Sequence, residues 1–454
     1  IRVRRKKLGH ILAGSLVEGL VMRLAASCDL ESVKTGKFVC VQGSEYNFFS
    51  LITDLELEVT NSDILLFPPE EDEKLLQDVL KQHDMYAKVQ LRPMLMLDKR
   101  GAHMPVKTIP SHFARVFEAS RDDVALIFGD EQESTRYFSI GQPLDMDTPV
   151  CVNMDLLTER SNGIFGKTGT GKTFLTRLIL AGLVRQGKAV NLIFDMHSEY
   201  GLQARKEGTG KAFVKGLKTL FPNQVAIFSL DPESTRRRGG SPDFEVTLNY
   251  QDIRVEDVMP LQGELNLHPT ALEAAYLIAN KYRKDWLRVL LAQEGTIKEF
   301  AEEVGAHAES VGALYRKLKR LETFPFLKKV ATEKSIIDTM LEYLDKGIHV
   351  VLEFGNHTSM LCYLLIANVV TRRIHDAYIS KTEKFLASQR KEDEPRKLMI
   401  TIEEAHKFLN SHAARQTIFG VIAREMRKYY VSLLVVDQRP SGIDQEIISQ
   451  IGTK

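Results

Sequence analysis

The stretch 163–180 constrains the fold of this 454-residue chain more than any other. It reads Gly-Ile-Phe-Gly-Lys-Thr-Gly-Thr-Gly-Lys-Thr-Phe-Leu-Thr-Arg-Leu-Ile-Leu, a short apolar segment, a glycine-rich turn and a helical pattern. The glycines at 166, 169 and 171 let successive backbone N–H groups point at one anion, and a helix starting near Lys172 aims its positive end there too. The pattern predicts a phosphate-binding loop, with an ordinary glycine-rich turn as the structural alternative.

Different residues of this loop are expected to contact the phosphates and the Mg²⁺ of a bound nucleotide. Lys172 is expected to reach the β- and γ-phosphates, and Thr173 to offer its hydroxyl to Mg²⁺. The apolar residues that follow give the helix a face that packs on a sheet. The predicted nucleotide-binding residues are Gly166, Thr168, Gly169, Thr170, Gly171, Lys172, Thr173 and Phe174.

Two consecutive carboxylates, Glu403 and Glu404, end an apolar strand expected over 397–403. One carboxylate can hold Mg²⁺, usually through water, while the next orients and deprotonates the water that attacks the γ-phosphate. We assign Glu403 to the metal and Glu404 to the water. The alternative is a charged strand end without a catalytic role.

A helix expected over 411–428 leads to a strand at 431–436 and then to Gln438. Gln438 at this strand tip, beside the carboxylate strand, is placed to sense the γ-phosphate by hydrogen bonding. Candidates to neutralise the charge that develops in phosphoryl transfer, one of them on a neighbouring subunit's nucleotide, are Arg424, Arg427 and Arg439. Each arginine alone is a weak signal, because a helix C-terminus favours cations anyway.

Two further clusters allow two interpretations each. Asp195, His197 and Glu199 follow a buried-type strand at 189–195 and either reach the nucleotide, its metal or its water, or serve capping and packing. Arg236, Arg237 and Arg238 are expected on a polar loop after the strand 224–229, where they suit phosphate contacts or a solvated surface equally.

The chain changes character near residue 148. Before it, short apolar runs at 37–42, 48–53, 89–96 and 124–128 predict the strands of a small β-barrel or sandwich, domain 1–147, with a helical excursion at 70–82. After it, strands alternate with helices, which predicts a mainly parallel sheet in domain 148–454. This α/β domain should carry a helical insertion at 255–346, a strand at 349–354, a helix at 358–379 and an exposed loop at 380–396.

Composition narrows the class of protein. The net charge of +1 gives no global attraction for nucleic acid, so any such binding needs a local basic surface. The basic cluster at 2–7 is one candidate and is otherwise a solvated terminus. Four scattered cysteines argue against a zinc site or a disulfide framework, and no long apolar run or signal peptide is found. We expect a cytoplasmic protein without a membrane span, trimmed at both ends.

Several motifs together resemble the HerA family of the FtsK–HerA translocases. They are Gly-Lys-Thr-Gly-Thr-Gly-Lys-Thr, Asp-Met-His-Ser-Glu-Tyr, Ile-Glu-Glu-Ala-His-Lys-Phe-Leu, and Ile-Ala-Arg-Glu-Met-Arg-Lys followed by Asp-Gln-Arg-Pro-Ser-Gly-Ile-Asp. The resemblance implies a HAS-type barrel, a RecA-like core with an inserted helical bundle, and a hexameric ring that threads double-stranded DNA using ATP.

In such rings the site lies between subunits, so the resemblance places Lys172, Thr173, Glu403, Glu404 and Gln438 in cis and Arg427, with Arg424 as a second candidate, in trans. Met426 stands where the family usually has glycine. The resemblance also implies a partner: the end-resection nuclease NurA or, in anti-phage defence, another effector such as a sirtuin-type NADase. The barrel is its expected docking surface.

Three functions remain open on these grounds. The first is an ATP-hydrolysing DNA translocase or helicase. The second is an ATP-binding ring scaffold that organises and regulates an effector enzyme, with DNA movement secondary. The third is a conjugation or secretion motor, which the barrel and the lack of a membrane anchor disfavour.

Overall fold

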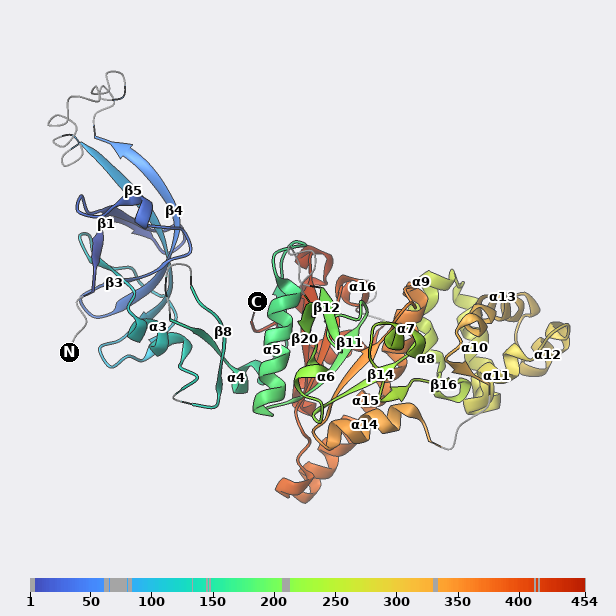
Figure 1. The fold of residues 1–454 in the computed structure, drawn as a ribbon. Helices are drawn as coiled ribbons and strands as arrows, with labels where there is room; N and C mark the ends of the chain where they lie inside the picture. Colours follow the sequence, from blue (N-terminus) through green and yellow to red (C-terminus); the bar gives the residue numbers. More distant parts are fainter. Residues whose placement is uncertain are drawn as a thin grey trace. The chain divides into compact units, whose positions relative to one another are not determined.

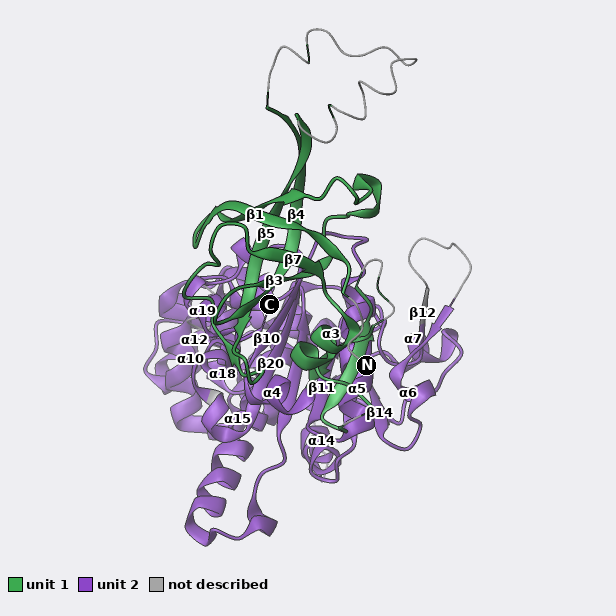
Figure 2. Ribbon diagram, turned by 90° about the vertical axis from the view of Figure 1, so that its left-hand side faces the viewer, with its two compact units in different colours: residues 1–153 green, residues 154–454 purple. Residues whose placement is uncertain are grey.

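The computed structural model describes residues 5–60, 65, 80, 84–132, 134–143, 146, 148–205, 213–329, 334–411, 414 and 417–453. The chain divides into two compact units, Ile1–Asn153 and Met154–Lys454 (Figure 2). Each unit has hydrophobic clusters of its own. The buried residues of two clusters lie between positions 8 and 124, and those of the large cluster lie between 190 and 451.

Unit 1 is a closed β-barrel of six strands. Its strands are β1 (Lys7–Ser15), β2 (Gly19–Leu24), β3 (Phe38–Gln42), β4 (Asn47–Val59), β5 (Met85–Leu97) and β7 (Arg115–Glu118), with the short β6 (His103–Met104) beside β5. The order β2-β1-β7-β3-β4-β5 closes because β2 also pairs with β5. Closure leaves no unpaired edge among these six strands, and alternate residues such as Val39, Val41 and Val89 fill the interior.

The predicted strand at 124–128 is wrong. These residues belong to helix α3 (Arg121–Phe128), whose first turn is closed by a capping box between Ser120 and Asp123. The hydroxyl of Ser120 accepts from the backbone N–H of Asp123, whose carboxylate in turn accepts from the backbone N–H of Ser120. Arg5, from the basic cluster at 2–7, is tied to the same Asp123 at 2.5 Å. The helix predicted at 70–82 lies outside the described residues apart from Leu80.

The core of unit 2 is a sheet of seven parallel strands. They are β10 (Asn162–Phe165), β11 (Val190–Asp195), β14 (Val225–Ser229), β15 (Phe244–Glu245), β18 (His349–Glu353), β19 (Leu398–Glu403) and β20 (Val431–Asp437). Their order is β10-β20-β19-β11-β18-β14-β15. The central strands are buried along their whole length, as strands covered on both faces must be. Their carboxyl ends all meet at one edge, where open sheets of this kind bind ligands.

Helices cover this sheet (Figure 1). The principal ones are α4 (Met154–Glu159), α5 (Lys172–Gln186), α7 (Pro232–Arg237), α14 (Ile336–Asp345), α15 (Met360–Ser388), α18 (Ile418–Glu425) and α19 (Gln445–Gln450). The predicted α/β fold is confirmed as a parallel sheet covered by helices, preceded in the chain by a small barrel. Among the described residues no helix is long and apolar enough to cross a membrane.

Two predicted loops in unit 2 are helical instead. The stretch 380–388 continues α15, which ends only where Gln389 takes a left-handed backbone with φ 52°. Arg236 and Arg237 lie on α7, which Asp231 caps and Pro232 begins. In both cases the charged residues lie on the exposed face of a helix. A prediction based only on how polar the segment is gives a loop there instead.

The region between 255 and 335 is largely helical. It holds α8 (Val255–Val258), α9 (Gln262–Leu265), α10 (Pro269–Tyr282), α11 (Trp286–Leu291), α12 (Ile297–Val304) and α13 (Ala308–Leu318). These helices lie on the opposite side of unit 2 from α5 (Figure 1). The buried ion pair of Arg372 on α15 with Asp257 on α8, at 2.6 Å, fastens this region to the core.

Candidate nucleotide-binding site

Strand order brings three separate motifs to one sheet edge. The glycine-rich turn joins β10 to α5, the paired carboxylates end β19, and Gln438 follows β20. Because β20 lies between β10 and β19, Gln438 stands between the loop and the carboxylates. The arrangement follows from parallel pairing, which carries all three strand ends to the same side.

The backbone of the loop needs its glycines. Gly169 and Gly171 have φ of 78° and 87°, in the left-handed region that side chains disfavour. At Gly166 an added Cβ would lie 2.6 Å from the Thr170 hydroxyl oxygen, so a larger side chain would clash within the loop. Lys172 Nζ donates to the Lys167 carbonyl at 3.2 Å, which draws the ammonium across the loop.

A chain of hydrogen bonds runs from the loop to Glu404. The Thr168 hydroxyl donates to Gln438 Oε1 at 3.0 Å, and Gln438 Nε2 donates to Glu404 Oε1 at 3.3 Å. Thr168 thereby orients the amide so that its NH₂ faces the carboxylate. Glu404 has φ 48°, and its other oxygen lies 3.7 Å from His406 Nδ1.

Glu403 has a different environment from its neighbour. It is buried, and Oε1 accepts from the hydroxyl of Tyr200 at 2.6 Å. Burial, and after it the charge of Asp195, raises the pKa of Glu403 to about 8. The second oxygen, Oε2, has no hydrogen-bond partner within the described part of the chain. An orphaned buried carboxylate oxygen needs a cation or a proton beside it.

These groups enclose a small polar pocket of about 170 Å³. Of the predicted site residues, those that line it are Thr168, Gly169, Lys172, Thr173, His197, Glu199, Glu403, Glu404 and Gln438. The predicted residues that do not line it are Gly166, Thr170, Gly171, Phe174, Asp195, Arg236, Arg237, Arg238, Arg424, Arg427 and Arg439. Phe174 is 54% exposed on α5. Arg424 lies on α18, and the exposed Arg427 follows on the 3₁₀ turn Met426–Tyr429.

Asp195 has a capping role. It is fully buried, and its carboxylate accepts from the backbone N–H groups of Glu199, Tyr200 and Gly201 at 2.8, 2.9 and 3.3 Å. Those bonds favour the ionised form, yet burial and the charge of Glu353 raise the pKa of Asp195 to about 7. The resulting tight turn holds Tyr200 against Glu403 and leaves Glu199 at the pocket.

The three arginines of 236–238 are engaged inside unit 2. Arg238 pairs with the buried Glu353 at 2.7 Å, and Arg236 pairs with Glu233 and Glu245. Arg237 donates to the backbone carbonyl of Glu233 at 3.3 Å. These contacts stabilise α7 and the end of β18, and none of the three arginines lines the pocket.

Sequence reasoning missed Tyr200, His406 and Asp437. Asp437 Oδ2 accepts from the backbone N–H of His406 at 2.7 Å and contacts His406 Nδ1 at 2.9 Å, which fixes the turn that follows Glu404. Asp437 ends a buried strand just as Asp195 does, and that position was the available signal. Tyr200 gives no comparable signal, because its partner Glu403 is 203 residues away.

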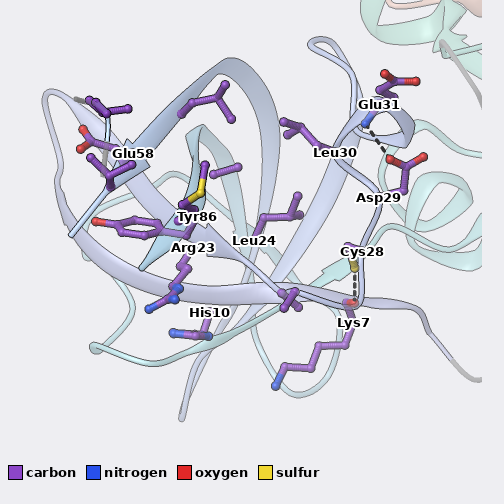
Figure 3. Close-up of a pocket in the computed structure, with 17 residues that line it drawn as sticks. Lys7, His10, Arg23, Leu24, Cys28, Asp29, Leu30, Glu31, Glu58 and Tyr86 are labelled. Carbon is purple, nitrogen blue, oxygen red and sulfur yellow. Dashed lines mark hydrogen bonds between the residues drawn. The ribbon is translucent and has the colours of Figure 1, made fainter. Parts of the chain in front are cut away.

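Unit 1 has a pocket of its own, about 1090 Å³ in volume (Figure 3). Lys7, His10 and Arg23 lie together on one side, and the Arg23 guanidinium stacks 4.6 Å from the centre of the Tyr86 ring. Burial and the charges of Lys7 and Arg23 lower the pKa of His10. The lining also includes Asp29, so it combines both signs of charge, and none of the phosphate-binding motifs contributes to it.

The parallel sheet, the glycine-rich loop and the paired carboxylates define a P-loop ATPase. The chain belongs to the family described as Helicase HerA, central domain, which matches residues 138–374, more than half of the sequence. The family predicted from the motifs is thereby confirmed.

Relatives found by sequence agree with this assignment. The DNA double-strand break repair helicase HerA of Pyrococcus furiosus is 24% identical over 75% of this chain and 63% of its own length. The protein of the same name from Sulfurisphaera tokodaii is 23% identical over 93% of this chain and 78% of its own. A weaker likeness, with a TM-score of 0.45 and 12% identity, is to the bacterial conjugative coupling protein TrwBdeltaN70, over 73% of this chain and 74% of that one.

Proposed function

We propose that this protein is an ATP-driven double-stranded DNA translocase or helicase. It acts as a ring, hexameric by resemblance, with a nuclease or another effector in DNA end processing or anti-phage defence, in the cytoplasm. The observation that carries the proposal is the hydrogen-bond chain from Thr168 through Gln438 to Glu404, beside Lys172 and Thr173. It couples the phosphate-binding loop to a carboxylate placed to activate water.

ATP binds with its phosphates in the loop between β10 and α5. The backbone N–H groups of the loop and the N-terminus of α5 supply partial positive charge, and Lys172 supplies a full one. Lys172 exchanges its bond to the Lys167 carbonyl for the β- and γ-phosphates. Gln438 senses the γ-phosphate because it stands between the loop and Glu404.

The residues present fit Mg²⁺. The orphaned Oε2 of Glu403 and the hydroxyl of Thr173 belong to the same pocket, and hydroxyl and carboxylate oxygens are the ligands that Mg²⁺ prefers. A cation there also offsets the burial of Glu403 and favours its ionised form. We propose that Thr173 and Glu403 hold the ion, which supplies charge neutralisation of the phosphates when bound.

Glu404 acts as the base that orients and deprotonates the attacking water. Its side chain reaches the pocket and keeps contact with solvent, whereas Glu403 is enclosed. Gln438 Nε2 donates to one oxygen of the Glu404 carboxylate, and His406 Nδ1 lies 3.7 Å from the other. Arg427, with Arg424 as a second candidate, completes a neighbour's site in the ring, since the exposed Arg427 is free to reach another subunit.

The test is the steady-state ATPase rate with and without linear duplex DNA at low and high salt. We expect the rate to rise with DNA at low salt and the stimulation to fall steeply as salt increases, because phosphate contacts release counterions. Displacement of a third strand from a triplex reports movement along the duplex. A rate that duplex DNA leaves unchanged, with no displacement, would contradict translocation and favour the effector-organising scaffold.

A further inference from the structure

Helices α12 and α13 are joined by a turn of three residues, 305–307. Gly305 takes φ 71°, and its N–H donates to the carbonyls of Ala301 and Glu302, which ends α12 abruptly. The backbone N–H of Ala306 also donates to the Ala301 carbonyl, at 2.9 Å. Two helices joined by a three- or four-residue turn with a glycine form the helix-turn-helix unit.

The buried residues agree with that unit. Phe300 and Ala301 of α12 and Val311 and Leu314 of α13 are buried, and α13 packs against α10 as the third helix. The small, fully buried Ala301 lets α12 approach its neighbours closely. Three packed helices therefore present one face of α13 outward.

That outward face is a shallow groove of about 690 Å³. Its lining combines Ile297 at the start of α12 with five residues of α13, which are Ala308, Glu309, Gly312, Tyr315 and Arg316. An added Cβ on Gly312 would lie 3.4 Å from an Arg316 guanidinium nitrogen and 3.7 Å from Ile297 Cγ2. Small residues keep the floor of the groove low, and Arg316 lies over it.

The basic residues gather at the end of α13. Arg316 and Lys317 lie in its last turn, and Lys319 and Arg320 follow on the 3₁₀ turn Lys319–Thr323, whereas Glu309 adds one carboxylate to the groove. Lys319 is tied to Glu294 at 3.4 Å, and Arg320 donates to a backbone carbonyl. Arg316 is exposed and has no ion-pair or hydrogen-bond partner within the described residues. With a net charge of only +1, the chain needs such a local surface to hold nucleic acid.

We propose that α12–α13 is a helix-turn-helix that contacts duplex DNA, with the outward face of α13 in the major groove. Arg316 contacts phosphate or a base edge, and the start of α13 near the exposed His307 reaches base edges, as the second helix of such units does. The inference rests on the proposed function in the choice of ligand. It adds a contact on the side of unit 2 opposite α5 (Figure 1).

The experiment compares wild type with Arg316→Glu and Ala313→Glu, the second of which adds a carboxylate to α13 without removing a cation. Lys284→Glu is the matched control, an equal charge reversal at an exposed residue of a separate 3₁₀ turn. The affinity of each variant for a labelled DNA duplex is measured over a salt series. The same measurement is repeated with each variant combined with Lys172→Ala, which removes the lysine assigned to nucleotide binding. Thermal unfolding checks each fold, and ATP hydrolysis without DNA checks each site.

We expect Arg316→Glu and Ala313→Glu to bind duplex DNA at least about fivefold more weakly, with a salt slope smaller by about one for Arg316→Glu. Lys284→Glu should match wild type, and hydrolysis without DNA should not change. Equal affinity in all variants, with DNA-stimulated hydrolysis retained, would overturn the inference, leave the proposed function standing and point to a protein partner for this face. If duplex binding depends on Arg316 but DNA does not stimulate ATP hydrolysis, the inference stands and the proposed translocase function is contradicted. If the protein does not bind duplex DNA at all, both the inference and the proposed function are contradicted.

Discussion

At the scale of residues, the site depends on two adjacent glutamates with unlike surroundings. Successive side chains of a strand point to opposite faces, yet Glu403 and Glu404 line one pocket. The reason is the left-handed backbone of Glu404, with φ 48°, which turns its side chain back toward the loop. Strained backbone of this kind is typical of functional positions. The turn is held by Asp437, which accepts from the N–H of His406.

Tyr200→Phe tests the positioning of Glu403. The change removes the only hydroxyl bonded to this carboxylate among the described residues, at 2.6 Å. We expect roughly a tenfold weaker dependence of nucleotide binding on Mg²⁺, because partners of metal-ligating carboxylates fix their orientation. We also expect about 1 kcal/mol less stability. Binding of a fluorescent ATP analogue over a Mg²⁺ series, and in EDTA, measures the first effect.

Tyr378→Phe is the matched control. Its hydroxyl is equally buried and has no hydrogen-bond partner within the described residues, so its loss should leave both Mg²⁺ dependence and stability nearly unchanged. Equal Mg²⁺ dependence in wild type and Tyr200→Phe would show that Tyr200 does not position Glu403.

His349 predicts a pH dependence of stability. It is buried at the start of β18, where Nδ1 accepts from the backbone N–H of Asn191 at 3.1 Å. Burial, and after it the charge of Arg396, lowers the pKa of His349 to about 4 from the usual 6.5. Between these values the unfolded chain binds more protons, so the free energy of unfolding falls as the pH is lowered from about 6.5 to about 4, by about 3 kcal/mol at most.

Denaturant unfolding across this pH range, beside His349→Asn, measures that contribution. Asparagine offers an oxygen acceptor near the position of Nδ1 and does not titrate, so its stability should fall less over the same window. Parallel curves for the two proteins would contradict the lowered pKa of His349.

At the scale of elements, the sequence predicts the strands and the loop well and helices with charged faces poorly. Strands such as β11, β19 and β20 are mostly apolar, so their existence was predictable. Each ends in a carboxylate, of which the sequence analysis singled out Asp195 and Glu403 and missed Asp437. The run 124–128 was not, because five apolar residues fit a strand or one face of a helix equally. The capping box of Ser120 and Asp123 favours the helix, because it satisfies backbone N–H groups of the first helical turn.

The site was predictable where chemistry follows local spacing. Lys172, Thr173, Glu403 and Glu404 come from such motifs. The bond of Tyr200 to Glu403 depends on how the turn after β11 folds back over β19, and no local pattern encodes that approach. Likewise, the chain from Thr168 to Gln438 joins residues 270 apart.

Gly169 lies in the loop that precedes α5, and Gly187 ends the same helix. Both have positive φ, 78° and 62°, and both have open space around an added Cβ. Alanine should therefore cost about 1 kcal/mol of stability at either position through backbone strain. Only Gly169→Ala should also weaken ATP binding, since Gly187 ends α5 away from the loop. Calorimetric unfolding and nucleotide titration of both variants test this, and equal loss of ATP binding in the two would contradict it.

At the scale of the whole molecule, the two units have separate hydrophobic cores. The nucleotide pocket lies wholly in unit 2. We therefore expect two unfolding transitions in calorimetry, with a non-hydrolysable ATP analogue and Mg²⁺ raising only one of them. Ligand at one hundred times its Kd adds about 2.7 kcal/mol to the unit that binds it. A single transition that shifts as a whole would show that the units unfold together.

The most direct measurement of the central claim compares ATP binding and turnover in wild type, Lys172→Ala and Glu404→Ala. Lys172→Ala should lose nucleotide affinity, because Lys172 is the one lysine among the described residues that lines the pocket. Glu404→Ala should bind ATP as wild type does and hydrolyse it at least about a hundredfold more slowly, because it lacks only the base. Turnover at the wild-type rate in Glu404→Ala would contradict the role of this carboxylate and with it the mechanism.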